Sequence, residues 1–281
     1  MTDLRNLMTA RVRHVRAWAR SRTPLFKLGA AGVVLCVVAL VLPSPYVIER
    51  PGPTADVLGE SGGAPIIAIT GADTHPDTGK LLLTTVNASG MPGYPALNAE
   101  ALWGWFSPGQ IVMPREAFVP SGQTAEEYKE QTERQMTGSQ DSAAAAALAF
   151  LKARGVDTDG VTVSMHVDDI GGPSAGMMYA LGVIDKLTEA QETGGLTVAG
   201  TGTIDADGKV GAIGGIQLKM IAAKRDGASW FLAPKDNCSS VVGHVPAGLT
   251  DVAVSTLGEA YDALTAIGEG RGGDLPRCTA Q

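Results

Sequence analysis

One serine in this sequence stands where covalent chemistry is possible. Ser174 lies in the run Ile170-Gly-Gly-Pro-Ser-Ala-Gly176, just before an apolar helix predicted over 177–187. Unpaired backbone N–H groups and the positive end of the helix dipole converge at such a position. The hydroxyl can therefore cap the helix, act as a nucleophile beside oxyanion donors, or line an anion site. The flanking glycines favour the nucleophile, because they let a substrate backbone approach closely.

A serine nucleophile needs a base, and the sequence offers two candidates. His166 is the nearest imidazole along the chain, but Lys219 is the better candidate. In a helix predicted over 216–226, Lys219 emerges from the apolar side, between Ala222 and Ala223. An ammonium held against apolar surface has its pKa lowered, and a lysine then becomes usable as a general base. A surface lysine that snorkels over apolar neighbours fits the same pattern.

The two segments together resemble the proteolytic domain of the Lon family. Lys219 ends the run Ile213-Gly-Gly-Ile-Gln-Leu-Lys219 and follows the serine by 45 residues. The match continues through three further segments, 201–204, 208–215 and 222–227. The resemblance implies an α+β fold, the Lon proteolytic-domain fold of mixed sheets with packed helices, with its core over 160–268. Residues 66–159 then supply the N-terminal strands and helices of the same exported domain.

The resemblance also implies roles for individual residues. Ser174 matches the nucleophile, Lys219 the general base, and Thr201 the hydroxyl residue that orients the lysine. His166 aligns loosely with a strand histidine of Lon and is expected to support the site. The oxyanion and substrate loop is expected to consist of Gly172, Pro173, Ala175 and Gly176.

The sequence departs from the family at two places. Lon usually has an acid three residues before the serine, where this chain has Gly171, and Asp168 and Asp169 lie further upstream. The wider plan looks like that of the membrane-anchored, ATP-independent Lon-like proteases, which generally carry a PDZ module before the Lon strand. Here Val156 leads almost directly into the predicted strand at Val161, so we expect no PDZ module.

The N-terminal region predicts a single membrane crossing. Residues 1–23 form a basic head, and 24–43 form an apolar span of about the length that a bilayer needs. Positive charge before the span predicts a cytoplasmic N-terminus and an extracytoplasmic body, anchored in the cell membrane. A cleaved signal peptide or a buried core helix are the alternatives. Residues 44–65 are rich in Pro and Gly and predict a stalk, and 269–281 form a C-terminal tail.

Charge, cysteine positions and the lack of certain motifs indicate which ligands and bonds to expect. The chain carries a net charge of −7, and because the first 27 residues are strongly basic, the body is strongly acidic. An acidic body argues against nucleic acid as a partner. Cys238 and Cys278 both lie in the exported part and predict one disulfide, with two unpaired thiols as the alternative. No metal-binding motif and no P-loop are found, so we expect no metal, no cofactor and no ATP hydrolysis.

Patterning places the remaining elements. Residues 66–70, 80–86 and 161–167 predict strands, and 124–154 predict one or two helices that begin with a Thr124–Glu127 capping box. Residues 87–123 are expected to be irregular, and the aromatic residues Trp103, Trp105 and Phe106 are expected to form a local apolar cluster rather than a binding platform.

These features together predict a membrane-anchored serine endopeptidase that cuts unfolded or exported polypeptides without ATP through a Ser174–Lys219 dyad. The alternative is a weak or inactive Lon-fold scaffold that binds membrane or exported proteins, and an anion-binding module is a third possibility. The resemblance further implies a homo-oligomer.

Overall fold

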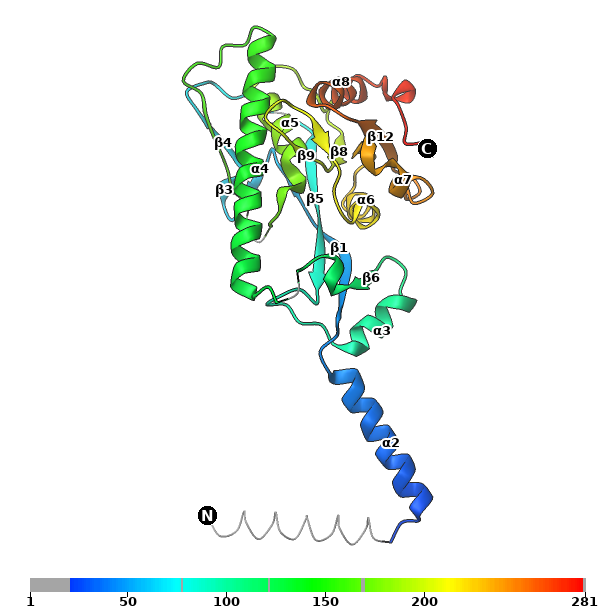
Figure 1. Ribbon diagram of the computed structural model, residues 1–281. Coiled ribbons are helices and arrows are strands. Elements are labelled where there is room, and N and C mark those ends of the chain that lie inside the picture. The colour runs from blue at the N-terminus through cyan, green and yellow to red at the C-terminus, as the bar shows by residue number, and fades with distance from the viewer. Residues whose placement is uncertain (1–20, 77, 121, 168–169, 280–281) are drawn as a thin grey trace.

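The computed structural model describes residues 21–76, 78–120, 122–167 and 170–279, shown in Figure 1. Residues 1–20, which hold most of the predicted basic head, and the acids at 168 and 169 lie outside the described residues. The body is built on one six-stranded sheet in the order β12-β11-β8-β5-β1-β6. The strands are β1 (Tyr46–Asp56), β5 (Lys80–Ser89), β6 (Ile111–Pro114), β8 (Thr197–Gly200), β11 (Trp230–Pro234) and β12 (Thr250–Val254).

The sheet is mixed. Strands β5, β8, β11 and β12 are parallel, whereas β1 runs antiparallel to both β5 and β6. Three two-stranded sheets flank it, formed by β2 (Glu60–Ser61) with β3 (Ala64–Pro65), β4 (Ile67–Thr70) with β7 (Thr162–Met165), and β9 (Thr203–Ile204) with β10 (Val210–Gly211).

Helices cover both faces of the large sheet. Successive strand residues point to opposite sides, and the apolar residues on each side pack against helices. Leu81 and Leu83 of β5 join the core under α4 (Ala125–Ala153), α5 (Gly176–Leu187) and α8 (Leu257–Gly268). Leu82 points to the other face and joins the core under α6 (Ile216–Arg225) and α7 (Cys238–Val241). The described residues also form four 3-10 turns: η1 (Arg115–Ala117), η2 (Pro173–Ala175), η3 (Lys235–Asn237) and η4 (Gly272–Asp274). The predicted mixed sheet with packed helices is confirmed.

The predicted capping box is also confirmed, since Thr124 and Glu127 bond to each other's backbone N–H at the start of α4. The stalk predicted over 44–65 is wrong, because Tyr46–Asp56 is strand β1, which lies between β5 and β6 in the sheet. Its prolines are tolerated because β6 pairs only with Tyr46–Glu49, and a bulge interrupts the pairing with β5 between Pro51 and Thr54.

The irregular region predicted over 87–123 is also partly wrong. It holds the end of β5, helix α3 (Asn98–Phe106) and strand β6. Trp103, Trp105 and Phe106 all lie on α3, and all three side chains are exposed.

Helix α2 (Pro24–Val41) extends away from the body, as Figure 1 shows, and none of its 18 residues is buried. It is long and apolar enough to cross a membrane, and the same features fit a signal sequence near the N-terminus. The buried core helix considered as an alternative is excluded by this exposure.

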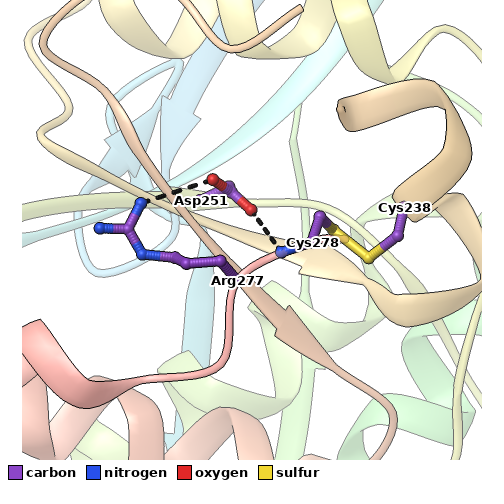
Figure 2. The surroundings of a disulfide bond; sticks show 4 residues. All are labelled: Cys238, Asp251, Arg277 and Cys278. Atoms are coloured by element: carbon purple, nitrogen blue, oxygen red, sulfur yellow. Dashed lines mark hydrogen bonds and ion pairs between the residues drawn. A yellow bond between two sulfur atoms is a disulfide. The ribbon is translucent and has the colours of Figure 1, made fainter. Parts of the chain in front are cut away.

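The C-terminal tail is joined to the body by a disulfide between Cys238 and Cys278 (Figure 2). Beside it, the Cys278 N–H donates to the carboxylate of Asp251, and Arg277 forms an ion pair with the same carboxylate. The Ala253 N–H donates to the Pro276 carbonyl. The tail is thus attached to β12 as well as to α7.

Loss of this disulfide is expected to destabilise the body. The bridge closes a loop over a sequence separation of 40 residues, so Cys278→Ser should lower the free energy of unfolding by about 4 kcal/mol. Denaturant unfolding of the full chain in detergent measures the difference. Cys36→Ser, which changes an exposed free cysteine on α2, is the matched control. Equal stability of the two variants would contradict this account of the tail.

Candidate active site

Ser174 occupies the 3-10 turn η2, between β7 and α5. Gly172 precedes the turn with φ of 90°, a backbone conformation that favours glycine. The N-cap of α5 is Ala175, and no side chain caps that helix. The capping interpretation of Ser174 is therefore wrong. Its hydroxyl is instead turned toward a lysine.

Lys219 is that lysine, and it is buried, with 2% of its surface exposed. It lies on α6, whose neighbouring residues Ile216, Met220 and Ala223 pack on the sheet. The Nζ atom lies 2.7 Å from Ser174 Oγ. Burial lowers the pKa of Lys219 from 10.5 to about 8, because the ammonium loses solvation. The snorkelling alternative is excluded by this burial.

Thr201 holds both members of the pair. Its hydroxyl accepts a hydrogen bond from Lys219 Nζ at 3.0 Å and donates one to the Ser174 carbonyl at 3.0 Å. The Gly202 N–H donates to the same carbonyl at 2.8 Å. Thr201 is fully buried and directly follows β8, so it lies where a parallel strand ends. Thr201 is thereby bonded both to η2, the turn that leads into α5, and to α6, which covers the opposite face of the sheet.

A buried carboxylate faces the lysine from β1. Glu49 is 5% exposed, and its Oε2 atom has no hydrogen-bond partner among the described residues. Burial raises the pKa of Glu49, and the positive charge of Lys219 opposes that rise. In return the Glu49 charge raises the pKa of Lys219, against the larger effect of burial. Sequence reasoning missed Glu49, because it placed this residue in a stalk.

Glycine lets α6 begin beside this carboxylate. Gly215, the N-cap of α6, has φ of 67°. A Cβ there would lie 2.8 Å from the Val86 side chain and 3.3 Å from Glu49 Oε2. Any larger residue would push α6, and Lys219 with it, away from β1 and β5.

The loop before α6 is also fixed from its other side. The side-chain amide of Asn237 accepts from the Ile213 N–H and donates to the Ile213 carbonyl, each at 2.9 Å. Asn237 is the residue before Cys238 of the disulfide. Sequence reasoning missed Asn237 as well, although it adjoins a cysteine that was singled out.

A pocket of about 110 Å³ opens beside the serine. One wall is the loop before α5, and the other is the part of β5 that extends past the end of β8. Its lining residues are Pro53, Thr84, Thr85, Val86, Asn87, Ile170, Gly171, Gly172, Ser174, Ala175 and Lys219. The bulge in β1 shapes this wall, since Thr85 Oγ1 donates to the Pro53 carbonyl there.

The structure does not bring His166 to this pocket. Its side chain is exposed after β7, and it is not among the lining residues. The glycine at position 171, where the Lon family usually has an acid, has a steric explanation. A Cβ there would lie 2.6 Å from the methyl group of Thr132 on α4. Across the described parts of the chain, no group of three or more His, Cys, Asp or Glu residues could hold a metal ion.

Comparison with known proteins finds one family model, described as the Lon protease (S16) C-terminal proteolytic domain, which matches residues 105–265. Three curated relatives are similar over shorter segments. Lon protease of Clostridioides difficile is 37% identical over 93 residues, 33% of this chain and 11% of that protein. Lon protease 2 of Bacillus subtilis is 35% identical over 95 residues, 34% of this chain and 17% of that protein.

Lon protease 2 of Herpetosiphon aurantiacus is 32% identical over 165 residues, 55% of this chain and 20% of that protein. The chain therefore spans a fifth or less of the length of these three relatives. The family model covers more than half of the chain, and it contains Ser174, Thr201 and Lys219. The chain belongs to the family of Lon protease C-terminal proteolytic domains.

Proposed function

We propose that this chain is a membrane-anchored serine endopeptidase that cleaves unfolded or exported polypeptides with a Ser174–Lys219 dyad. Family membership supports serine peptidase activity in general. The observation that carries the finer proposal is the 2.7 Å contact between Ser174 Oγ and a buried lysine whose pKa is lowered to about 8. A base within hydrogen-bond reach and with a pKa near the working pH is what nucleophile activation requires.

The proposed reaction proceeds through an acyl-enzyme. Neutral Lys219 takes the proton of Ser174 as Oγ bonds to the scissile carbonyl carbon. The resulting ammonium gives this proton to the leaving nitrogen as the C–N bond breaks. Lys219 then takes a proton from the attacking water, and Ser174 Oγ recovers it as the ester bond breaks. The backbone N–H of Ser174 and those of its neighbours other than Pro173 would stabilise the oxyanion.

Other residues take supporting roles in this proposal. Thr201 uses its one proton for the Ser174 carbonyl, so it can only accept from Lys219. This fixes the direction of one lysine N–H and leaves the lone pair of neutral Nζ for Ser174. Glu49 is proposed as a positioning residue, which acts through the charge of Lys219. The exposed position of His166 gives it no part in these steps.

The proposed setting is the cell membrane. The apolar helix α2 would be retained as a single span, with the basic head in the cytoplasm and the body outside it. The disulfide fits an oxidising compartment. We further propose that cleavage needs no ATP, in line with the lack of a P-loop in the sequence, that nucleic acid is not a partner, and that a homo-oligomer forms.

Removal of either dyad member should abolish cleavage. Ser174→Ala and Lys219→Met in the full chain are expected to lower kcat/KM for an unfolded protein substrate by at least about a thousandfold without ATP. Product peptides are measured by mass spectrometry. Ser164→Ala, on exposed β7, and Lys224→Met, on the exposed side of α6, are the matched controls. Undiminished cleavage by folded Ser174→Ala would refute the dyad, and inactivity of the wild type would favour a scaffold.

Activity should rise with pH. The reactive form of Lys219 is neutral, and burial lowers its pKa to about 8. Below that pH the lysine is protonated and cannot accept the serine proton. We therefore expect kcat/KM to increase through pH 8 and to level off above it, whereas an exposed lysine would place the rise near pH 10. A profile that is flat between pH 6 and 10 would contradict the assignment of the base.

Removal of the Glu49 charge should shift this profile. Glu49 favours the ammonium, so Glu49→Gln is expected to lower the pKa of Lys219 further and move the rise in kcat/KM to lower pH. A purely structural role would reduce the rate at every pH and leave the midpoint in place. Glu60→Gln, which alters an exposed carboxylate on β2, is the control and should leave the profile unchanged.

A further inference from the structure

Helix α3 has a buried face of small residues and an exposed face of large ones. Ala101 and Gly104 are buried, and a Cβ on Gly104 would lie 2.7 Å from the side chain of Val112 on β6. The exposed apolar side chains of α3, here named the aromatic face, are Leu102, Trp103, Trp105 and Phe106. Trp103 is 69% exposed, Trp105 55% and Phe106 81%. Exposed apolar surface of this kind is typical of a site that contacts a membrane or another protein.

The start of α3 is attached to the last turn of α2. The Asn98 side chain donates to the Ala39 carbonyl at 2.9 Å, and its backbone N–H donates to the Leu42 carbonyl at 3.0 Å. Pro43 and Leu97 form a β-bridge, and the Ser44 N–H donates to the Ala96 carbonyl. Figure 1 shows α3 beside the junction between α2 and the body. The position of α3 relative to α2 is therefore set by backbone and side-chain bonds.

These bonds also fix the depth of α3 in a membrane. The exposed apolar run of α2 ends at Leu42, so a bilayer crossed by α2 has its hydrocarbon boundary there. Asn98 bonds to that same residue. The aromatic face therefore starts at the boundary between hydrocarbon and water, where Trp side chains are enriched. Tyr46, at the first position of β1, packs edge-on against Trp105 and keeps that ring at this level.

We infer that the aromatic face of α3 is inserted into the interfacial layer of the membrane that α2 crosses, and that it seats the body on the lipid surface. This inference rests on the proposed anchoring by α2 and adds a second contact to it. Interfacial helices bury their apolar face about 5–10 Å into the headgroup region. The one acid of α3, Glu100, forms an ion pair with Arg50 on β1 and does not add an unpaired charge to the face.

Two tryptophan variants of the full chain test this inference in phosphatidylcholine vesicles that contain brominated lipids. The first carries Trp18→Phe and Trp230→Phe, so that only Trp103 and Trp105 emit. The second carries Trp18→Phe, Trp103→Phe and Trp105→Phe, and keeps only Trp230. Trp230 is the matched control because it lies far from α2. It begins β11, and the pairing of β11 with β8, β8 with β5 and β5 with β1 places it beside the end of β1 that is away from α2.

Bromine near the lipid headgroup should quench the first variant more strongly than bromine at the chain ends, and neither should quench the second. Vesicle flotation reports anchoring separately, and circular dichroism reports the fold. A chain that floats with unquenched Trp103 and Trp105 would overturn the seating and leave the anchor intact. Emission that depends on protein density and not on bromine would mean that a second copy covers the face, and would also overturn it. A chain that does not float would refute both proposals.

Discussion

The site depends on one unfavourable burial: Lys219 is held out of water, with its Nζ atom beside the Ser174 hydroxyl. Burial makes the ammonium of Lys219 unfavourable and thereby lowers its pKa to about 8. The surrounding structure has to hold this side chain in place although it costs stability in its charged form. Helix packing on the sheet, the Thr201 hydroxyl and the charge of Glu49 all serve that purpose. A solvated lysine at the same distance from Ser174 would be a much poorer base at neutral pH.

The sheet brings the two proposed catalytic side chains together from its two faces. Ser174 precedes α5, and Lys219 lies on α6 across the sheet. They meet only because β8 ends at Gly200, where Thr201 can contact both, while β5 continues as the wall of the pocket. The loop that leads into α6 is held by Asn237, next to the disulfide. The site therefore depends on strand lengths as much as on the residues that do chemistry.

The sequence predicts those features that depend on local physics. The helical wheel indicates the burial of Lys219, because Ile216, Met220 and Ala223 surround it on one helix. The capping box marks the start of α4 for the same local reason. Glu49 could not be found this way, since its approach to Lys219 depends on the register of β1 against β5 and β6. Helix α3 was missed because prolines and glycines surround it, and only its contacts with β1 and β6 reveal its small-residue face.

Only the four residues Leu42, Pro43, Ser44 and Pro45 separate α2 from β1, and the Ser44 and Leu42 backbones are bonded to the segment that leads into α3. With α2 in a bilayer, no flexible linker of any length would connect the body to the membrane, so its orientation to the bilayer would be restricted. The pocket begins at Pro53, seven residues along β1 from Tyr46, which corresponds to roughly 20 Å of strand. A substrate that is itself fixed in the same membrane must then extend about six residues to reach the serine. The fold would then select substrates by length. A membrane-fixed substrate would be cleaved only if its extended segment next to the membrane is long enough to reach the serine.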